Sequence, residues 1–223
     1  MSSARDQILA ALRKAKPADI EPNAKIGRQA LLPPKFVRDA RDLAELFIEK
    51  LALASTTCAV LDQASEVPAH VAQWLDSRGL AGQSLSLADE PLLQKLDWAR
   101  AGLALRESGP NILSPATIVS CAFAGVAETG SIAMVTNGRS RPTHNLLADS
   151  HIVVLSRSQI VPSFEDVWRA VREHGLPRSL AFITGASRTA DIEMTIELGV
   201  HGAVRMHVIL LHEETSPRLE FAR

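Results

Sequence analysis

The segment 184–202, TGASRTADIEMTIELGVHG, places hydroxyl, guanidinium and carboxylate groups directly after a short apolar run. Its apolar spacing predicts a helix that begins near Thr189 and ends at Gly199. The start of a helix exposes unpaired backbone N–H groups and carries partial positive charge. With Arg188 beside these groups and Gly185 permitting a close backbone approach, the turn is predicted to hold a phosphate, carboxylate or sulfonate.

The same residues also fit a purely structural role. Ser187, Thr189 and Asp191 are residue types that cap helices, and acids such as Asp191 and Glu193 complement the dipole of a first turn. The segment lacks the Gly-x-x-x-x-Gly-Lys pattern of a phosphate loop. Taken alone, this stretch therefore favours helix capping over ligand binding.

A second candidate lies within IVSCAFAGVAETGSIAMVT at 118–136, where Glu128, Thr129 and Gly130 separate two apolar runs. The runs are too close for a crossover helix, so they are predicted to form an antiparallel hairpin or a sharply bent strand. A carboxylate enclosed by small residues is placed to act as a base or nucleophile. The alternative is a solvated hairpin tip in which Thr129 and Ser131 only satisfy the turn.

A third candidate is the loop 137–145, NGRSRPTHN. Arg139, Arg141 and His144 have the chemistry of an anion clamp, although most arginine pairs in loops are simply solvated. The seven histidines form no i, i+4 pair on a predicted helix. We therefore predict no metal site.

Composition restricts the class of protein that must position these groups. The chain has 223 residues, 46% hydrophobic content and a formal charge of -1, which gives no bulk attraction to nucleic acid or anionic lipid. Cys58 and Cys121 are too few for a disulfide framework or an iron–sulfur cluster, and both lie in apolar runs as small hydrophobic residues. We expect a cytoplasmic protein without a membrane span.

Short apolar runs alternate with helical segments, which predicts an α/β fold with a mainly parallel sheet and helices on both faces. Residues 1–36 are predicted to form a helix and a proline-rich arm, and residues 37–223 the α/β domain. A last β-α-β unit is predicted to run from 180 to 211. The other predicted strands are 57–61, 84–87 and 151–155, and the other predicted helices are 39–54, 68–77 and one that opens at Ser163 and closes at Gly175. The stretch 92–105 is predicted to be a helix or a helix followed by a strand.

Three blocks, AETGSI at 127–132, HIVVLSRSQIVPSFED at 151–166 and TGASRTADIEMTIELGVHG at 184–202, resemble the lactate-utilisation protein C family, whose members carry the LUD domain. The resemblance covers the C-terminal half in detail and the rest in outline. It implies a fold like that of glucosamine-phosphate deaminase, ribose-phosphate isomerase and CoA transferases. The chain departs from the family pattern at Ala203, where proline is frequent, and in the loop 137–147.

The resemblance implies a role in bacterial oxidation of L-lactate to pyruvate, beside partner proteins of which one carries iron–sulfur clusters. This chain is expected to bind no cofactor itself. Carried over by motif, Glu128 is the candidate catalytic acid, and the candidate ligand-binding residues are Thr129, Gly130, Gly185, Ser187, Arg188, Thr189 and Asp191. All are expected to face one cleft at the carboxyl ends of the strands.

The sequence is also compatible with two other functions. The first is a stand-alone enzyme or binding protein for a phosphosugar, an acyl-CoA or another small anionic ligand. The second is a non-catalytic assembly module that uses the proline-rich arm to hold an iron–sulfur partner.

Overall fold

The computed structural model describes residues 4–14, 42–106, 116–136, 147–189, 197–199 and 202–212. The chain forms two compact units, Met1–Lys35 and Phe36–Arg223. In the first unit, helix α1 (Ala4–Lys14) exposes Ile8 and Leu9. The residues assigned above to a proline-rich arm lie outside the described ranges.

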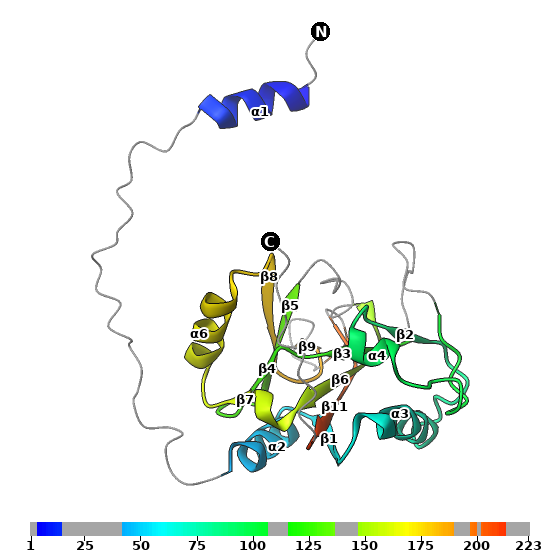
Figure 1. The fold of residues 1–223 in the computed structure, drawn as a ribbon. Helices are drawn as coiled ribbons and strands as arrows, with labels where there is room; N and C mark the ends of the chain where they lie inside the picture. The colour runs from blue at the N-terminus through cyan, green and yellow to red at the C-terminus, as the bar shows by residue number, and fades with distance from the viewer. Residues whose placement is uncertain are drawn as a thin grey trace. The chain divides into compact units, whose positions relative to one another are not determined.

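The second unit is built on a five-stranded parallel sheet in the order β1-β11-β6-β3-β2 (Figure 1). The central strand β6 is buried at every residue, because both faces of the sheet are covered. This burial agrees with the continuous apolar runs that predicted parallel strands. The bounds are β1 Thr56–Leu61, β2 Leu85–Leu87, β3 Thr117–Cys121, β6 Ser150–Ser156 and β11 Arg205–Leu211.

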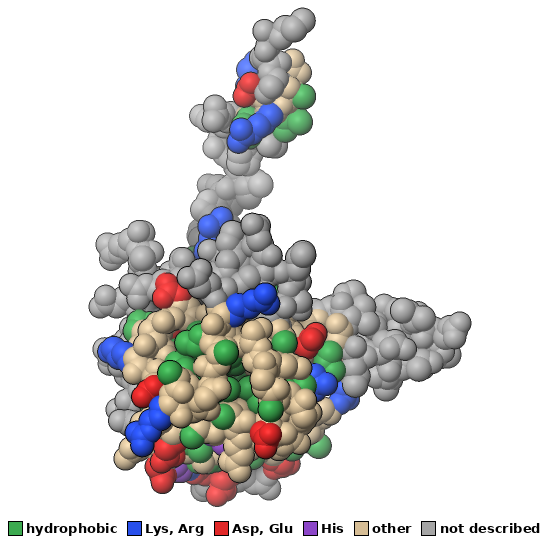
Figure 2. Space-filling model, turned by 90° about the vertical axis from the view of Figure 1, so that its right-hand side faces the viewer, with side chains coloured by type: hydrophobic (Ala, Val, Ile, Leu, Met, Phe, Trp, Pro, Cys, Tyr) green, Lys and Arg blue, Asp and Glu red, His purple; other side chains and the backbone are tan. Residues whose placement is uncertain are grey.

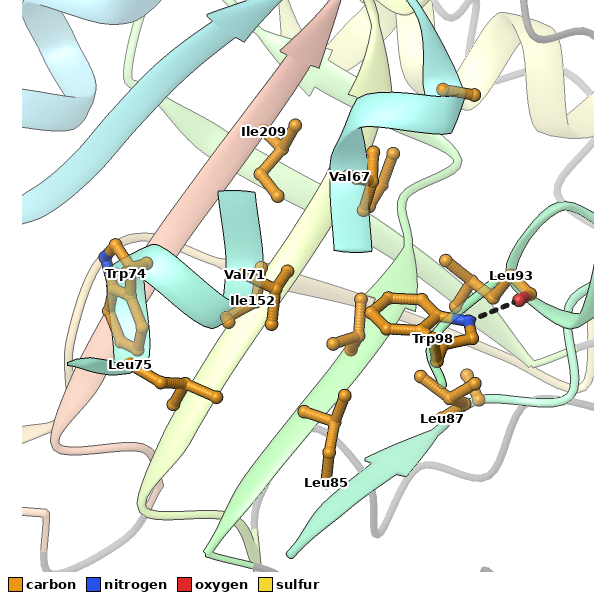
Figure 3. Packing of buried hydrophobic residues seen from close by; sticks show 14 of the residues in the cluster. Val67, Val71, Trp74, Leu75, Leu85, Leu87, Leu93, Trp98, Ile152 and Ile209 are labelled. Carbon is orange, nitrogen blue, oxygen red and sulfur yellow. Dashed lines mark hydrogen bonds between the residues drawn. The ribbon is translucent and has the colours of Figure 1, made fainter. Parts of the chain in front are cut away.

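One face of the parallel sheet packs against helix α3 (Val67–Asp76) and the short helices η1 (Ala64–Glu66) and α4 (Pro91–Gln94). Trp74 and Leu75 pack near the end of α3, and Val71 packs on Ile152 and Ile209 of the sheet (Figure 3). Trp98 is buried in the same core and donates from its indole N–H to the Leu93 carbonyl at 2.7 Å. This hydrogen bond satisfies a polar group that burial would otherwise make costly.

The opposite face packs against helix α2 (Leu43–Leu53) and a second, four-stranded mixed sheet in the order β7-β4-β5-β8. Its strands are β4 Ala124–Val126, β5 Ser131–Thr136, β7 Ile160–Val161 and β8 Ser179–Ile183. Helix α6 (Phe164–His174) covers the other face of this sheet through Val167 and Val171. The predicted antiparallel hairpin is therefore confirmed as β4 and β5, with β3 left in the parallel sheet.

The predicted start of α6 is also confirmed. The Asp166 carboxylate accepts hydrogen bonds from the backbone N–H of Ser163 at 3.2 Å and from its hydroxyl at 2.8 Å. The helix ends at Gly175, whose φ of 99° suits glycine.

Three predictions about elements are wrong. Arg188–Thr189 and Glu197–Leu198 form an antiparallel pair of short strands, β9 and β10, instead of the two ends of one helix. No β-α-β unit joins 180–184 to 204–211, because β8 pairs antiparallel with β5 in the second sheet and β11 belongs to the first. The stretch 92–105 contributes only the end of α4 and an isolated bridge at Leu105.

The surface carries no single dominant charge on the face that Figure 2 presents, where acidic and basic side chains both occur among polar and apolar atoms. This distribution fits the net charge of -1. Among the described residues, no helix combines the length and apolarity needed to cross a membrane.

Candidate functional site

Two turns that carry the family motifs both pack against the C-terminal end of α2. Gly130 has φ +71°, and a Cβ there would lie 2.7 Å from the Leu51 backbone nitrogen. Gly185 has φ +87°, and its Cβ would overlap the Ala54 carbonyl oxygen. No other residue fits without displacing backbone, since both positions combine the left-handed region with a close approach. These glycines therefore bring the two turns to one place.

A chain of hydroxyl groups joins the two turns directly. The Thr129 and Ser131 hydroxyl oxygens lie 2.7 Å apart, and the Ser131 hydroxyl lies 2.6 Å from that of Thr184. Thr129 also accepts from the Ser131 backbone N–H at 3.3 Å. Three hydroxyls in series can redirect their hydrogens together, so the junction can donate to or accept from a ligand.

Arg188 supplies the positive charge of this junction. Its guanidinium donates to the hydroxyl of Ser55, the residue that links α2 to β1 and has a positive φ of 56°. Arg188 is exposed at its side chain, and no carboxylate among the described residues pairs with it. An exposed guanidinium with no ion pair to a described residue can bind an anion.

The backbone around Ser187 is held by a short ladder of hydrogen bonds and not by a helix. Its N–H donates to the Ala203 carbonyl at 2.9 Å, and its carbonyl accepts from Gly199 at 3.0 Å. The predicted anion site at a helix start is therefore wrong in its mechanism, because the N–H of Ser187 is already used and Arg188 begins a strand. Of the predicted anion-binding features, the guanidinium group remains.

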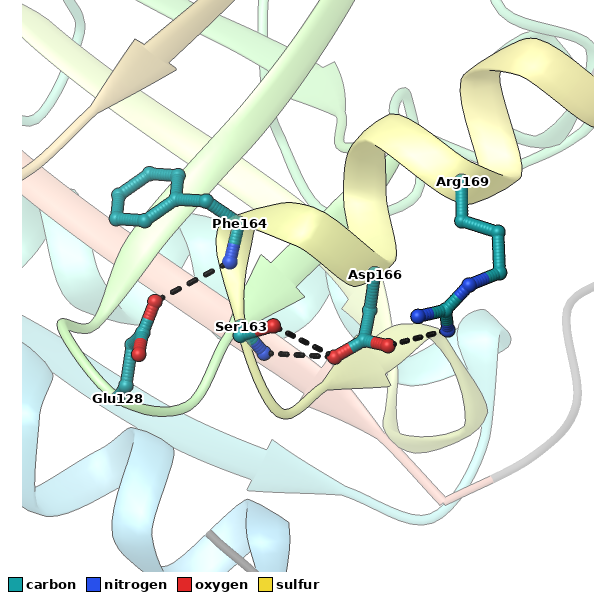
Figure 4. A network of polar contacts seen from close by, with 5 residues as sticks. All are labelled: Glu128, Ser163, Phe164, Asp166 and Arg169. Atoms are coloured by element: carbon teal, nitrogen blue, oxygen red, sulfur yellow. Dashed lines mark hydrogen bonds and ion pairs between the residues drawn. The ribbon is translucent and has the colours of Figure 1, made fainter. Parts of the chain in front are cut away.

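Glu128 lies at the hairpin turn, where it contacts the start of α6 (Figure 4). Its Oε1 accepts from the Phe164 backbone N–H at 3.2 Å, and its own N–H donates to the Pro162 carbonyl at 3.2 Å. A carboxylate beside a helix N-terminus is stabilised by the free amides and the dipole. This is a structural role for the acid that the sequence marked as catalytic. Its second carboxylate oxygen has no hydrogen bond to a described residue.

The junction lies at the amino edge of the parallel sheet. Ser55 directly precedes Thr56, the first residue of β1, and Ala203 comes two residues before Arg205, the first residue of β11. The expected position at the carboxyl ends of the strands is wrong for the Ser-Arg-Thr block, because β8 runs into this region from the second sheet. Asp191, Glu193, Arg139, Arg141 and His144 lie outside the described residues, as does the side chain of Thr189.

Two residues of the junction were missed from the sequence, namely Ser55 and Thr184. Ser55 stands in the run Ser-Thr-Thr between a predicted helix and a predicted strand, which is the signal that could have pointed to it. In the sequence, Thr184 is recognisable only as the end of an apolar run. Its hydroxyl becomes significant once β5 and β8 pair, because this pairing places Ser131 beside Thr184.

The two cysteines are free thiols placed away from this chemistry. Burial raises the pKa of Cys58 to about 11, and burial together with the charge of Glu90 raises the pKa of Cys121 further. Neither sulfur is a thiolate at neutral pH, which supports their interpretation as small hydrophobic residues. In the part of the chain that the structure describes, no group of three or more His, Cys, Asp or Glu side chains is arranged to hold a metal ion.

Known proteins resemble this chain in sequence and in fold. Residues 44–211 match the LUD domain family. Proteins called "Lactate utilization protein C" are similar over shorter stretches: that of Anoxybacillus flavithermus is 34% identical over 86 residues, covering 39% of each chain. That of Exiguobacterium sp. is 39% identical over 102 residues, covering 44% of this chain and 43% of the relative.

The match to the Bacillus subtilis lactate utilization protein C is 30% identical over 93 residues and covers 40% of this chain and 39% of that protein. The aligned part of the chain thus spans about two fifths of the length of these relatives. The crystal structure of a DUF162 family protein from Deinococcus radiodurans has a similar fold, with a TM-score of 0.56, 24% identity, and coverage of 76% of this chain and 96% of that one. Because the LUD match extends over most of the chain and includes both motif turns, the chain belongs to the LUD domain family.

Proposed function

We propose that this chain is a component of a bacterial L-lactate utilisation system that oxidises L-lactate to pyruvate in the cytoplasm. The observation that carries the proposal is the LUD match over 44–211 together with the similarity to lactate utilization proteins C. In this proposal a partner protein holds the iron–sulfur clusters, since two cysteine thiols are too few for a cluster site. The chain itself contributes a binding surface for an anionic ligand.

We infer that the ligand site is the junction at the end of α2. Arg188 is its cationic group, and the Thr129 and Thr184 hydroxyls, linked through the buried Ser131 hydroxyl, are its polar wall. A carboxylate such as that of lactate or pyruvate needs one fixed cation and one or two hydroxyl donors, and the junction offers both. Gly130 and Gly185 support the site by holding both turns on α2. Ser187, Thr189 and Asp191 are further candidates for ligand binding because they stand close to Arg188 in the sequence.

Glu128 is the acid of the proposed site. The variant Glu128→Gln distinguishes a role in proton transfer from a role in stabilising the start of α6. If the acid takes part in proton transfer, Glu128→Gln lowers lactate-dependent activity by about two orders of magnitude or more, because the amide cannot exchange a proton. If it serves α6 alone, Glu128→Gln costs only about 0.5–1 kcal/mol of stability, since the amide oxygen still accepts from Phe164.

Genetic complementation tests the pathway assignment. Deleting the gene from its host is expected to abolish growth on L-lactate while leaving growth on pyruvate unchanged. Wild-type chain restores growth, and Arg188→Gln restores it poorly. Arg172→Gln, which changes an exposed arginine of α6, serves as the matched control and is expected to restore growth fully. Normal growth of the deletion strain on L-lactate would exclude the proposal.

The finer fold assignment, to the group that contains glucosamine-phosphate deaminase, ribose-phosphate isomerase and CoA transferases, is also a proposal. It is supported by the parallel sheet covered by helices on one side and by α2 with a second sheet on the other. If the purified chain alone turned over a phosphosugar or an acyl-CoA thioester, the stand-alone enzyme would replace the pathway role.

A further inference from the structure

The face of the parallel sheet that packs against α3 changes from apolar to polar at its amino end. Thr117, Ser150 and Arg205 are adjacent in register on β3, β6 and β11, and one row further along the strands Thr57 pairs with His207. In that second row the face becomes apolar at Ile152, Val119 and Leu87, and it stays apolar further along the strands at Val154, Ile209 and Leu211. Polar groups gathered at one end of a core face need a reason beyond packing.

Helix α3 brings aromatic and basic groups onto this polar end. His70, Trp74 and Arg78 follow one another at intervals of four residues, which places them on one side of the helix and the turn after it. The His207 ring stacks on His70 and on Trp74, with centroids 5.2 Å apart in each case. The Arg78 guanidinium carbon lies 4.1 Å from the centre of the Trp74 ring. The stack fixes Arg78 at the edge of the sheet.

The two histidines share a hydrogen bond and are uncharged at neutral pH. Their Nε2 atoms lie 2.9 Å apart, so one donates and the other accepts. The Thr57 hydroxyl lies 2.8 Å from His207 Nδ1 and donates to the Met206 carbonyl at 3.4 Å. Because the Thr57 hydroxyl hydrogen is used in the bond to Met206, His207 donates from Nδ1 to the Thr57 oxygen and accepts from His70 at Nε2. Burial, followed by the charge of Arg78, lowers the pKa of His70.

Arg205 lies two residues before His207 on β11, so it is on the same face of the sheet as the ring stack that carries Arg78. The Arg78 Nη1 donates to the Trp74 carbonyl at 3.2 Å and to the Ser77 hydroxyl at 2.9 Å, which closes the end of α3. Burial and the nearby charge of Arg205 lower the pKa of Arg78. Within the described ranges neither guanidinium forms an ion pair, and Asp149 contacts Arg205 only through its backbone carbonyl at 3.0 Å. The hydrogen bonds at the end of α3 explain why Arg78 lies here, but they do not explain the presence of Arg205.

Buried hydroxyls beside Arg205 are a second, independent sign of a polar site. Thr117 and Ser150 are fully buried, and their side-chain oxygens have no hydrogen-bond partner among the residues that the structure describes. A buried hydroxyl without a partner costs free energy, so proteins rarely leave two of them side by side. Ser150 is the register neighbour of Arg205. Both oxygens are closed off from solvent, so they indicate the polar character of this edge and do not themselves contact a ligand.

We propose that Arg78, Arg205 and His70 form a second ligand site, for the phosphate group of a phosphate monoester. Two unpaired guanidinium groups match the charge of a phosphate monoester, which is about −1.5 to −2 at neutral pH, better than that of a monocarboxylate. His70 is half-buried and supplies a neighbouring imidazole that gains a proton when the dianion binds. The site lies on the α3 face of the sheet, opposite α2, and does not depend on the lactate proposal.

Histidine-selective NMR of the full-length protein tests this site, with inorganic phosphate as the probe at constant ionic strength. We expect saturable shifts of the His70 and His207 ring signals and a rise in the pH at which His70 titrates. Binding is therefore tighter at pH 6 than at pH 8. Arg78→Gln and Arg205→Gln are each expected to weaken phosphate binding at least about tenfold, because each removes a charge-assisted contact.

Arg172→Gln is the matched control, since it removes an exposed arginine on α6 and should leave phosphate binding unchanged. Acetate at equal ionic strength should cause no saturable shift. The proposal is overturned if phosphate causes no saturable change, if the double variant Arg78→Gln/Arg205→Gln binds as well as the parent, or if acetate binds equally. Circular dichroism of each variant shows that the fold is retained.

Discussion

Two glycines hold the motif turns against helix α2, at places where the backbone leaves no space for a side chain. Gly130→Ala and Gly185→Ala are each expected to destabilise the protein by about 2–4 kcal/mol, the sum of left-handed strain and the displacement of α2 backbone. Urea unfolding followed by circular dichroism measures the change.

Gly82→Ala provides the control for backbone strain alone. Gly82 has φ +79°, but a Cβ there would meet nothing within 4 Å. We expect a cost of about 1–2 kcal/mol, from the left-handed region only. Equal effects at Gly82, Gly130 and Gly185 would show that the close approach to α2 contributes nothing to stability.

The His70–His207 pair makes stability depend on pH. Burial and the charges of His70 and Arg78 lower the pKa of His207 to about 3, from an ordinary value of 6.5. The folded chain thus binds this proton less tightly than the unfolded chain. The resulting stabilisation is complete above pH 6.5 and is lost as the pH falls toward 3.

We expect the free energy of unfolding to fall by about 2 kcal/mol between pH 7.5 and pH 5 on account of His207. Urea titrations at several pH values measure this. In His207→Gln the slope attributed to this residue should disappear, whereas His212→Gln, which changes the residue after β11, should retain it. An unchanged slope in His207→Gln would contradict the assignment.

At the scale of elements, the start of α6 depends on a reciprocal contact between Ser163 and Asp166. Asp166→Ala removes the acceptor of both Ser163 hydrogen bonds and the exposed ion pair with Arg169, and is expected to cost about 1–2 kcal/mol. Glu165→Ala, in the same first turn but exposed, is the matched control and should cost about 0.5 kcal/mol or less. Similar costs for both variants would mean that the dipole, and not the cap, stabilises the helix start.

The elements that the sequence predicted correctly are those with one clear local period. Continuous apolar runs located β1, β6 and β11, and the cap residues located both ends of α6. The segment after Arg188 failed because its apolar spacing fits a helix, whereas Arg188–Thr189 pairs with Glu197–Leu198. Pairing of this kind depends on contacts distant in sequence, which local periodicity does not record.

The same limit applies to the candidate site. Motif residues marked both turns, but their meeting point depends on β8 pairing with β5 and on the end of α2. The sequence contained no signal that β8 leaves the parallel sheet. It therefore placed the Ser-Arg-Thr block at the wrong edge, and it did not predict that the Glu128 carboxylate accepts a hydrogen bond from the Phe164 N–H at the start of α6.

At the scale of the whole molecule, the architecture separates two polar regions by the parallel sheet. The α2 face carries the family motifs with Arg188, and the α3 face carries the histidine pair with Arg78 and Arg205. Both lie near the amino ends of strands. Under the two proposals the protein binds an anion on each face, and substitutions at one region should leave binding at the other unchanged.

Reconstitution of lactate-dependent dye reduction tests the pathway role most directly. The chain is co-expressed with the proposed iron–sulfur partner and any further component of the system, and dye reduction by L-lactate is measured with and without it. We predict that activity requires the chain and that Arg188→Gln lowers it while Arg172→Gln does not. Activity unchanged when the chain is omitted would contradict the account.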